Sequence, residues 1–255
     1  LAEARQLADS GVRELIVIAQ DITRYGMDWD GKPHLADLLE ELCKLDFHWI
    51  RLHYLYPEWI DDRLIDVIAR EDKILKYLDI PLQHCNDKIL KKMNRRGDKK
   101  YLCALLDKLR ERIPGLVLRT SIIAGLPGEG EEEFDELCDF VEEGLCDYIG
   151  VFAYSREEGT RAYDLPDQVE DDEKAFRAQR LRDLADDVCT PLIASRVGST
   201  VDVLVEGTEE DGQLFGRAMC QAPEVDGVTY VDQGKPGEVV RVKIADTLLY
   251  EMEGE

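Results

Sequence analysis

Polar side chains recur at five points along the chain, each where a short apolar segment stops. In enzymes built on a parallel sheet, the loops at the carboxyl ends of the strands converge and carry the site. One polar strand end is common in any fold, whereas five together favour a site on that face. The five points are Ala19-Gln20-Asp21, Tyr56-Pro57, Gln83-His84, Gly125-Leu126-Pro127-Gly128-Glu129 and Tyr154-Ser155.

The glycine turn GLPGEGEEEF begins at Gly125 and leads into a stretch with helical periodicity. A glycine loop at the start of a helix can hold phosphate with its backbone N–H groups. Four glutamates crowd this loop, and repulsion between like charges costs on the order of 1 kcal/mol or more each. We therefore expect a neutral ring or a cation here rather than phosphate, and the absence of Gly-Lys-Ser/Thr excludes a Walker loop. The glutamates are Glu129, Glu131, Glu132 and Glu133.

Three other charged features have two interpretations each. Asp21 and Arg119, at neighbouring strand ends, could hold the ammonium and carboxylate of an amino-acid moiety, although a structural salt bridge is the simpler interpretation. His84 could act as an acid–base group or be a hydrogen-bonded structural residue. The single basic run is a solvated helix surface or a partner contact. Its members are Lys88, Lys91, Lys92, Arg95, Arg96, Lys99 and Lys100.

Composition limits the class of protein. The 255 residues carry a net charge of -23, which disfavours polyanions such as nucleic acid and favours a basic partner, although acidity also simply aids solubility. Seven scattered cysteines include no Cys-x-x-Cys, so no disulfide framework and no local metal site are predicted. Because no apolar run of about 18 residues and no signal peptide occur, we expect a cytoplasmic protein without a membrane span.

The elements that position these residues alternate between strands and helices up to about residue 190. A first helix without a preceding strand is followed by five βα-type units, which predicts an α/β fold with a parallel sheet, similar to a barrel that lacks its first strand. The apolar strand at 12–21 is expected to be buried on both faces, and the long last helix to be disturbed at Pro191. The predicted strands are 12–21, 49–57, 76–84, 116–129 and 148–155, and the predicted helices are 1–11, 33–45, 61–72, 86–97, 98–115, 131–145 and 171–197.

The remainder of the chain has a different pattern. Five short alternating strands at 200–208, 213–220, 227–232, 237–244 and 247–253 predict a small β-barrel of OB-like character. We expect two domains, residues 1–197 and 198–255. The second carries 13 Asp and Glu against 4 Lys and Arg, so it is the more acidic per residue.

Together, the strand-end segments resemble radical-SAM methylthiotransferases of the RimO type. The resemblance lies in LIVIAQDITRYG, RLHYLYPEWI, LDIPLQHCNDKILKKMNRRG, LRTSIIAGLPGEGEEEF and GVFAYSREEGT, and the β-rich tail resembles the TRAM domain of that family. It implies a partial (β/α)6 TIM-like radical-SAM barrel lacking its first strand, followed by a five-stranded OB-like barrel. The sister family, the tRNA-modifying MiaB type, would be expected to differ at IAQD, YLYP and PLQH.

The resemblance implies an enzyme that uses S-adenosylmethionine and two 4Fe-4S clusters to insert a methylthio group at an aspartate of small-subunit ribosomal protein S-twelve. Gln20 and Asp21 would lie near the methionyl ammonium, Arg119 near its carboxylate and Gln83 near the ribose. The adenine would lie at Ile123 and at the glycine turn, Gly125, Pro127 and Gly128 included. His84, Glu129 and Tyr154 complete the expected cofactor site.

Two departures from the family limit what this chain is expected to do. The three-cysteine motif of the family belongs upstream of Leu1, and none of the seven cysteines replaces it by spacing. We therefore expect this chain alone to be colourless, inactive and without a tightly bound cofactor. Gly130 stands where the family commonly has Thr, which weakens the helix cap. The acidic tail fits a ribosomal-protein partner; a tRNA methylthiotransferase and a non-catalytic binding module are the alternatives.

Overall fold

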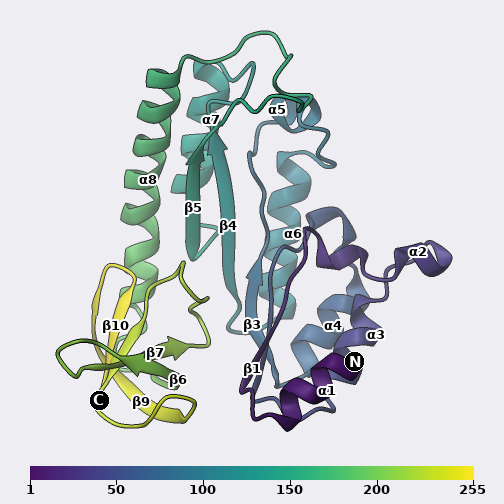
Figure 1. The fold of residues 1–255 in the computed structure, drawn as a ribbon. Helices are drawn as coiled ribbons and strands as arrows, with labels where there is room; N and C mark the ends of the chain where they lie inside the picture. Colours follow the sequence, from purple (N-terminus) through teal and green to yellow (C-terminus); the bar gives the residue numbers. More distant parts are fainter.

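A five-stranded parallel sheet forms the first half of the molecule. The computed structural model describes residues 1–255. The strands lie in sequence order, β1-β2-β3-β4-β5, and every neighbouring pair is parallel, so each connection crosses over the sheet. The sheet is open, as predicted (Figure 1). The strands are β1 Glu14–Val17, β2 Trp49–Leu52, β3 Ile74–Asp79, β4 Val117–Ala124 and β5 Tyr148–Ala153.

Amphipathic helices connect these strands, and α4 illustrates why they form. The side chain of Asp61 caps the helix by accepting a hydrogen bond from the Leu64 N–H at 2.8 Å. Leu64, Ile65, Val67 and Ile68 recur at helical spacing and are buried in the main core. The helices are α1 Ala2–Asp9, α2 Met27–Asp30, α3 Leu35–Leu42, α4 Asp62–Arg70, α5 Asp87–Lys92, α6 Lys99–Arg112, α7 Glu131–Glu142 and α8 Asp171–Ala194, with 3-10 turns at Ile22–Arg24 and Pro57–Trp59.

Two expectations about these elements are wrong. Strand β1 is not buried on both faces: all four of its residues are half-buried, and the following Ile18 is 58% exposed. The reason is its place at the edge of the sheet, where β2 is its only neighbouring strand. Helix α8 is also continuous through Pro191. Pro191 has no N–H to donate to the Asp187 carbonyl, but the helix runs on for only three residues, to Ala194, so the lost bond affects its last turn alone.

A closed five-stranded barrel forms the C-terminal part, as predicted. Its strand order is β10-β8-β7-β6-β9. The last turn lies later than expected, because Thr247 and Leu248 belong to β9 and the chain reverses at Leu249, whose φ is +54°. The strands are β6 Thr200–Thr208, β7 Leu214–Ala218, β8 Thr229–Val231, β9 Val239–Leu248 and β10 Glu251–Gly254.

The sheet uses its two faces differently, and β4 shows the pattern. Leu118 and Ile122 belong to the large core together with residues of the helices. Val117 points the other way and belongs to a second core that includes residues of the C-terminal barrel. Further along that second face, Arg119 and Ile123 line a cavity instead. The period of two along a strand therefore places one row against the helices and the other against the barrel and the cavity.

Candidate functional site

A cavity of about 990 Å³ lies over the face of the sheet that the helices do not cover. Its walls come from the segments that follow β1, β2, β3 and β5, from β4 and β5 themselves, and from the barrel loop that contains Val225. Half of its lining residues are hydrophobic, as is usual for sites that bind small molecules. The lining residues are Gln20, Tyr54, Tyr56, Pro81, Gln83, Arg95, Arg119, Ser121, Ile123, Phe152, Ala153, Tyr154, Ser155 and Val225.

Three buried polar atoms of this lining have no hydrogen-bond partner within the protein. They are Oε1 of Gln83, Nη1 of Arg95 and the hydroxyl of Tyr154. Buried polar atoms are nearly always paired, so a cluster of unpaired ones around a single cavity is unusual. The atoms offer an acceptor, a cationic donor and a hydroxyl. A polar ligand with an apolar portion would complement this set.

Backbone strain is concentrated in the same place. Tyr54 and Gln83 line the cavity with positive φ values of +60° and +71°, a conformation that costs non-glycine residues energy. Gln83 is held there by strand-like bonds to β4: its N–H donates to Ser121 O, and its carbonyl accepts from the Ile123 N–H, both at 2.8 Å. The backbone of Gln83 is therefore fixed by the sheet while its side-chain oxygen is left unpaired.

The predicted pair of Asp21 and Arg119 does not form. Asp21 caps the turn that follows it by accepting from the Thr23 N–H at 2.9 Å, and its second oxygen is buried without a partner. Arg119 is the third residue of β4 rather than a strand-end residue, and it pairs with Asp79 at 3.0 Å and with Asp226 of the barrel at 3.2 Å. Its guanidinium is thus already held by two carboxylates.

The pKa values of the two carboxyl groups are shifted in opposite directions. Burial opposes ionisation of Asp79, but contacts from His53 and Arg119 outweigh it and hold the pKa of Asp79 below its ordinary value. Burial raises the pKa of Asp226, although Tyr77 and Arg119 act in the opposite direction. Asp79 is therefore the stronger anionic partner of Arg119.

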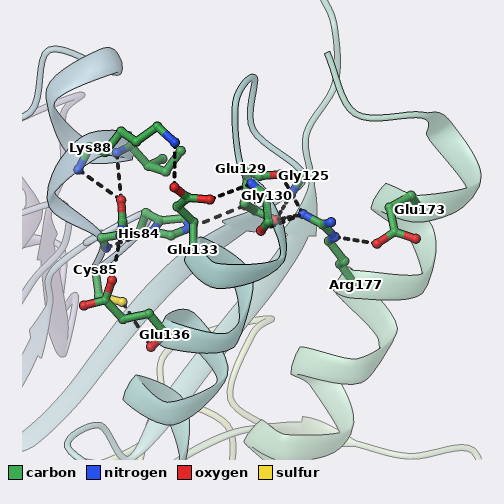
Figure 2. Close-up of polar contacts among 12 residues, drawn as sticks. His84, Cys85, Lys88, Gly125, Glu129, Gly130, Glu133, Glu136, Glu173 and Arg177 are labelled. Atoms are coloured by element: carbon green, nitrogen blue, oxygen red, sulfur yellow. Dashed lines mark hydrogen bonds and ion pairs between the residues drawn. The ribbon is translucent and has the colours of Figure 1, made fainter. Parts of the chain in front are cut away.

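The side chain of Glu129 folds back onto the glycine turn and holds it together, as Figure 2 shows. The buried carboxylate accepts from the Gly125 N–H at 3.0 Å, pairs with Arg177 at 3.0 Å and lies 3.3 Å from His84 Nε2. Burial would raise the pKa of Glu129, but the contacts with His84, Arg177 and the Gly125 N–H lower it overall. Glu129 and His84 are therefore structural members of the turn, and neither lines the cavity.

The crowding of glutamates expected at this turn is offset in part, because two of the four, Glu129 and Glu133, form ion pairs. Besides the Glu129–Arg177 pair, Glu133 pairs with Lys88 at 2.6 Å (Figure 2), and Lys88 belongs to α5. Glu133 also accepts from the Gly130 N–H at 2.8 Å, which compensates in part for a helix cap without a side chain. The turn is consequently less negative than its sequence indicates.

The backbone of the turn is covered by lysine side chains. A Cβ on Gly125 would lie 2.4 Å from Lys174 Cγ, and one on Gly128 would lie 1.8 Å from Lys92 Nζ. The neighbouring Pro127 lines a second cavity of about 350 Å³, which shares Ile123 and Tyr154 with the larger one.

Of the eleven residues expected at the cofactor, five line the large cavity: Gln20, Gln83, Arg119, Ile123 and Tyr154; the strand-end residues Tyr56 and Ser155 line it too. Pro127 lines the adjoining one. Asp21, His84, Gly125, Gly128 and Glu129 line neither. The sequence did not single out Tyr54, Ser121 or Val225 as site residues, and it assigned Arg95 to the basic run.

Most members of that basic run contact acidic groups or aromatic rings. Lys99 lies 3.3 Å from Glu143, and Arg96 lies over the ring of Trp59. Arg95 lies over the ring of Tyr56, with 4.4 Å from the guanidinium carbon to the ring centroid. The stacking of Arg95 on an aromatic ring beside the cavity distinguishes it from the rest of the basic run, and this contact could not be predicted from the sequence.

The cysteines do not form a metal site. All seven are free, and five of them are buried. Burial raises the pKa of Cys85, Cys146 and Cys189 to about 12, so these thiols are protonated in the chain described here. No group of three or more His, Cys, Asp or Glu side chains could hold a metal ion. In the same structure, none of the helices has the length and apolar character needed to cross a membrane.

The open parallel sheet, its strand-end cavity and the appended barrel define the class of protein. The chain belongs to the radical SAM superfamily, whose model matches residues 1–141, and a TRAM domain model matches residues 197–255. A solved archaeal structure, Elp3 of Methanocaldococcus infernus with an N-terminal deletion, is similar with a TM-score of 0.51 and 15% identity over 73% of this chain and 48% of that chain. At this identity the likeness concerns the fold alone.

Curated relatives are more similar in sequence. A protein of Anaeromyxobacter sp. named "Ribosomal protein uS12 methylthiotransferase RimO" is 49% identical over 259 residues, which is 100% of this chain and 55% of the relative. The protein of the same name from Myxococcus xanthus is 48% identical over 99% of this chain and 54% of the relative. The chain thus spans about half the length of the curated relatives that it matches.

Proposed function

We propose that this chain is the cofactor-binding and C-terminal part of an enzyme that adds a methylthio group to the β-carbon of an aspartate in small-subunit ribosomal protein uS12. The observation that carries the proposal is the 49% identity, along the whole chain, to a protein named for that reaction. The cavity supports it independently, because it lies at the strand ends where parallel-sheet enzymes place their sites.

The lining of the cavity fits S-adenosylmethionine. When bound beside a reduced cluster, this cofactor would supply the radical that abstracts a hydrogen atom from the substrate. The unpaired oxygen of Gln83 is suited to accept from a ribose hydroxyl, and Ile123 offers an apolar surface to the adenine. Gln20, which lines the cavity, is suited to the methionyl ammonium, whereas Asp21 caps the turn next to it and lines neither cavity.

Three of the residues expected to contact the cofactor are not assigned that role in this proposal. Glu129 and His84 close the turn instead of contacting a ligand, and Arg119 is already paired with two carboxylates. In this proposal the glycine turn acts through its shape: it positions Pro127 at the second cavity, next to Ile123 and Tyr154.

The residues of this chain do not fit an iron–sulfur cluster, since the cysteines are scattered and no three of them lie together. We propose that both clusters are held by cysteines of a longer protein of which this chain is a part.

The acidic C-terminal domain, for which we propose the bounds 198–255, is suited to a basic partner. Its barrel carries a depression of about 440 Å³ lined by Tyr230 and several carboxylates. Ribosomal proteins are basic, whereas tRNA would be repelled by a chain with a net charge of -23. We therefore propose uS12 as the partner and, because ribosomes lie there, the cytoplasm as the compartment. The acidic lining residues are Glu209, Asp211, Asp232, Glu253 and Glu255.

The test is anaerobic reconstitution of the full-length protein with iron and sulfide, followed by incubation with S-adenosylmethionine and two substrates in parallel. A gain of one methylthio group on a uS12 peptide, with no gain on tRNA, is the expected result. Modification of tRNA alone would replace the proposal with a tRNA methylthiotransferase. Failure to form any cluster would leave a non-catalytic binding module.

A further inference from the structure

We propose that Arg95 binds a carboxylate in the large cavity. Two cationic side chains line this cavity, Arg95 and Arg119. Arg119 is occupied by Asp79 and Asp226, so a third carboxylate beside it would be repelled. Arg95 makes no ion pair and no side-chain hydrogen bond, and its Nη1 atom is buried without a partner. The cation available to an anionic ligand is therefore Arg95.

The end of helix α5 fixes where Arg95 lies. Asn94 takes the left-handed conformation with φ +57°, and its N–H donates to Lys91 O at 3.1 Å. The Arg95 N–H donates to Leu90 O at 2.9 Å. These two bonds form a Schellman motif, which reverses the chain directly after the helix. The turn brings residue 95 to the cavity instead of continuing the exposed face of α5.

The orientation of the guanidinium is fixed as well. It lies over the ring of Tyr56, which follows β2 and also lines the cavity. Stacking of this kind holds the plane of the guanidinium and reduces the freedom lost when a ligand binds. A planar fork of donors matches a carboxylate, which can accept two parallel hydrogen bonds from it. The geometry and the unpaired Nη1 thus favour the same ligand chemistry.

Two carboxylates could reach this position: the methionyl carboxylate of S-adenosylmethionine and the side chain of the target aspartate. Which of them Arg95 holds rests on the proposed function, whereas the capacity of Arg95 to bind a carboxylate does not. The inference also replaces the earlier expectation that Arg119 faces the methionyl carboxylate.

Isothermal titration calorimetry on the 255-residue chain tests the assignment with two ligand pairs. The first is S-adenosylhomocysteine and 5′-methylthioadenosine, which lacks the amino-acid end. The second is a uS12 peptide and the same peptide with its target aspartate replaced by asparagine. We expect Arg95→Gln to weaken the carboxylate-bearing member of one pair about tenfold or more and to leave the other member unchanged. The affected pair identifies the source of the carboxylate.

Arg95→Lys and Arg96→Gln are the matched variants. Arg95→Lys keeps the charge but not the fork, so it should recover only part of the affinity. Arg96→Gln removes the neighbouring guanidinium, which lies 5.7 Å from the ring centroid of Trp59. This variant should bind all four ligands with the affinity of wild type. The inference would be overturned if an Arg95→Gln protein that melts like wild type bound both carboxylate-bearing ligands with affinities within about twofold of wild type.

A measurement on the wild-type chain guards against a misfolded variant and a wrong function. Titration with sodium acetate should shift the Nε–Hε NMR resonance of Arg95 and leave that of Arg96 unchanged. An Arg95 resonance that does not move would overturn the inference. If acetate shifts Arg95 while neither adenosyl compound binds, carboxylate binding stands and the proposed function fails.

Discussion

The Nε atom of Arg119 in β4 lies 3.2 Å from Oδ1 of Asp226 in the C-terminal barrel, and both side chains are almost completely buried. The second oxygen of Asp226 accepts from the Tyr77 hydroxyl at 2.5 Å and from the Ala222 N–H at 2.9 Å. Asp226 therefore connects two strands of the sheet to a loop of the barrel. It also explains why Arg119 is not free to hold a ligand.

Replacement of Asp226 by alanine should destabilise the chain strongly. The change leaves the Tyr77 hydroxyl and the Ala222 N–H without an acceptor and removes one of the two carboxylates from Arg119. Breaking such a buried network costs about 3 kcal/mol or more. Urea denaturation would measure the loss. Glu210→Gln, at an exposed site in the same barrel, is the control, and equal stabilities for the two variants would contradict the network.

Acid should destabilise the protein in part through Glu129. Because the pKa of Glu129 is lower in the folded chain than its ordinary value of 4.5, its contribution is present above about that pH and is lost as the pH falls through the folded value. Glu129→Gln should therefore lower stability at neutral pH and lose less stability between about pH 5 and pH 3 than wild type does.

Chemical denaturation at a series of pH values would measure this slope. Glu131→Gln serves as the control, since Glu131 lies at the start of the same helix, is exposed and forms no ion pair. Its slope should match that of wild type. A Glu129→Gln protein with an unchanged slope would show that another carboxylate dominates the acid response.

Three glycines with similar backbone angles should tolerate alanine to different degrees. Gly159 has φ +82° and open space around it, so alanine there should cost about 1 kcal/mol for the left-handed conformation alone. Gly128→Ala also displaces the mobile end of Lys92. Gly125→Ala should cost the most, roughly 2–3 kcal/mol, because the new atom lies 3.2 Å from the Cα of Lys174 as well as close to its side chain.

Thermal or urea unfolding of the three variants would rank them. An equal loss at all three positions would mean that only the φ angle matters and that the lysines rearrange freely. A loss at Gly159 that exceeds the loss at Gly125 would contradict the packing of α8 against the turn.

The thiols should react slowly in the folded chain. Five cysteines are buried, and only Cys43 and Cys103 are partly exposed. Burial raises the pKa of Cys43 to about 11, so even this thiol is mostly protonated at about pH 8. An aromatic disulfide reagent should therefore modify at most two of the seven thiols rapidly, and all seven after unfolding in guanidinium chloride.

The double variant Cys43→Ser, Cys103→Ser should abolish the early phase of this reaction. If a buried thiol such as Cys85 reacted first, the packing of α7 over the large core would be more open than described, because Cys85 belongs to that core and contacts the Glu136 carbonyl. Mass spectrometry of the modified protein would locate the reacting residue.

The architecture was predictable from the sequence because its signals are local. Apolar runs, helical periodicity and glycine turns indicated five parallel strands and a five-stranded barrel, and both are present. The predictions were wrong where the burial of an element depends on its position in the whole sheet. The residues of β1 are as apolar as those of a central strand, and only the strand order shows that β1 lies at an edge.

The candidate site was predictable only in part for a related reason. Strand ends identified Gln20, Gln83 and Tyr154 as neighbours of the cavity. The partners of Arg119 and Glu129 were not predictable, because Asp226 lies 107 residues from Arg119 and Arg177 lies 48 residues from Glu129. Such long-range pairs decide whether a charge contacts a ligand or the protein itself.

The core shared by Trp49, Tyr77 and Tyr148 of the sheet with Val203 and Met252 of the barrel has a consequence for selectivity. A binding module on a flexible linker can hold a bound peptide at many distances from the catalytic site. A module that shares a core with the catalytic domain holds the peptide at one fixed distance from that site. A peptide held by the barrel would therefore place in the cavity only the residue at a fixed number of positions from the anchoring one. Selection among peptides would then depend on the spacing between two residues as well as on their chemistry.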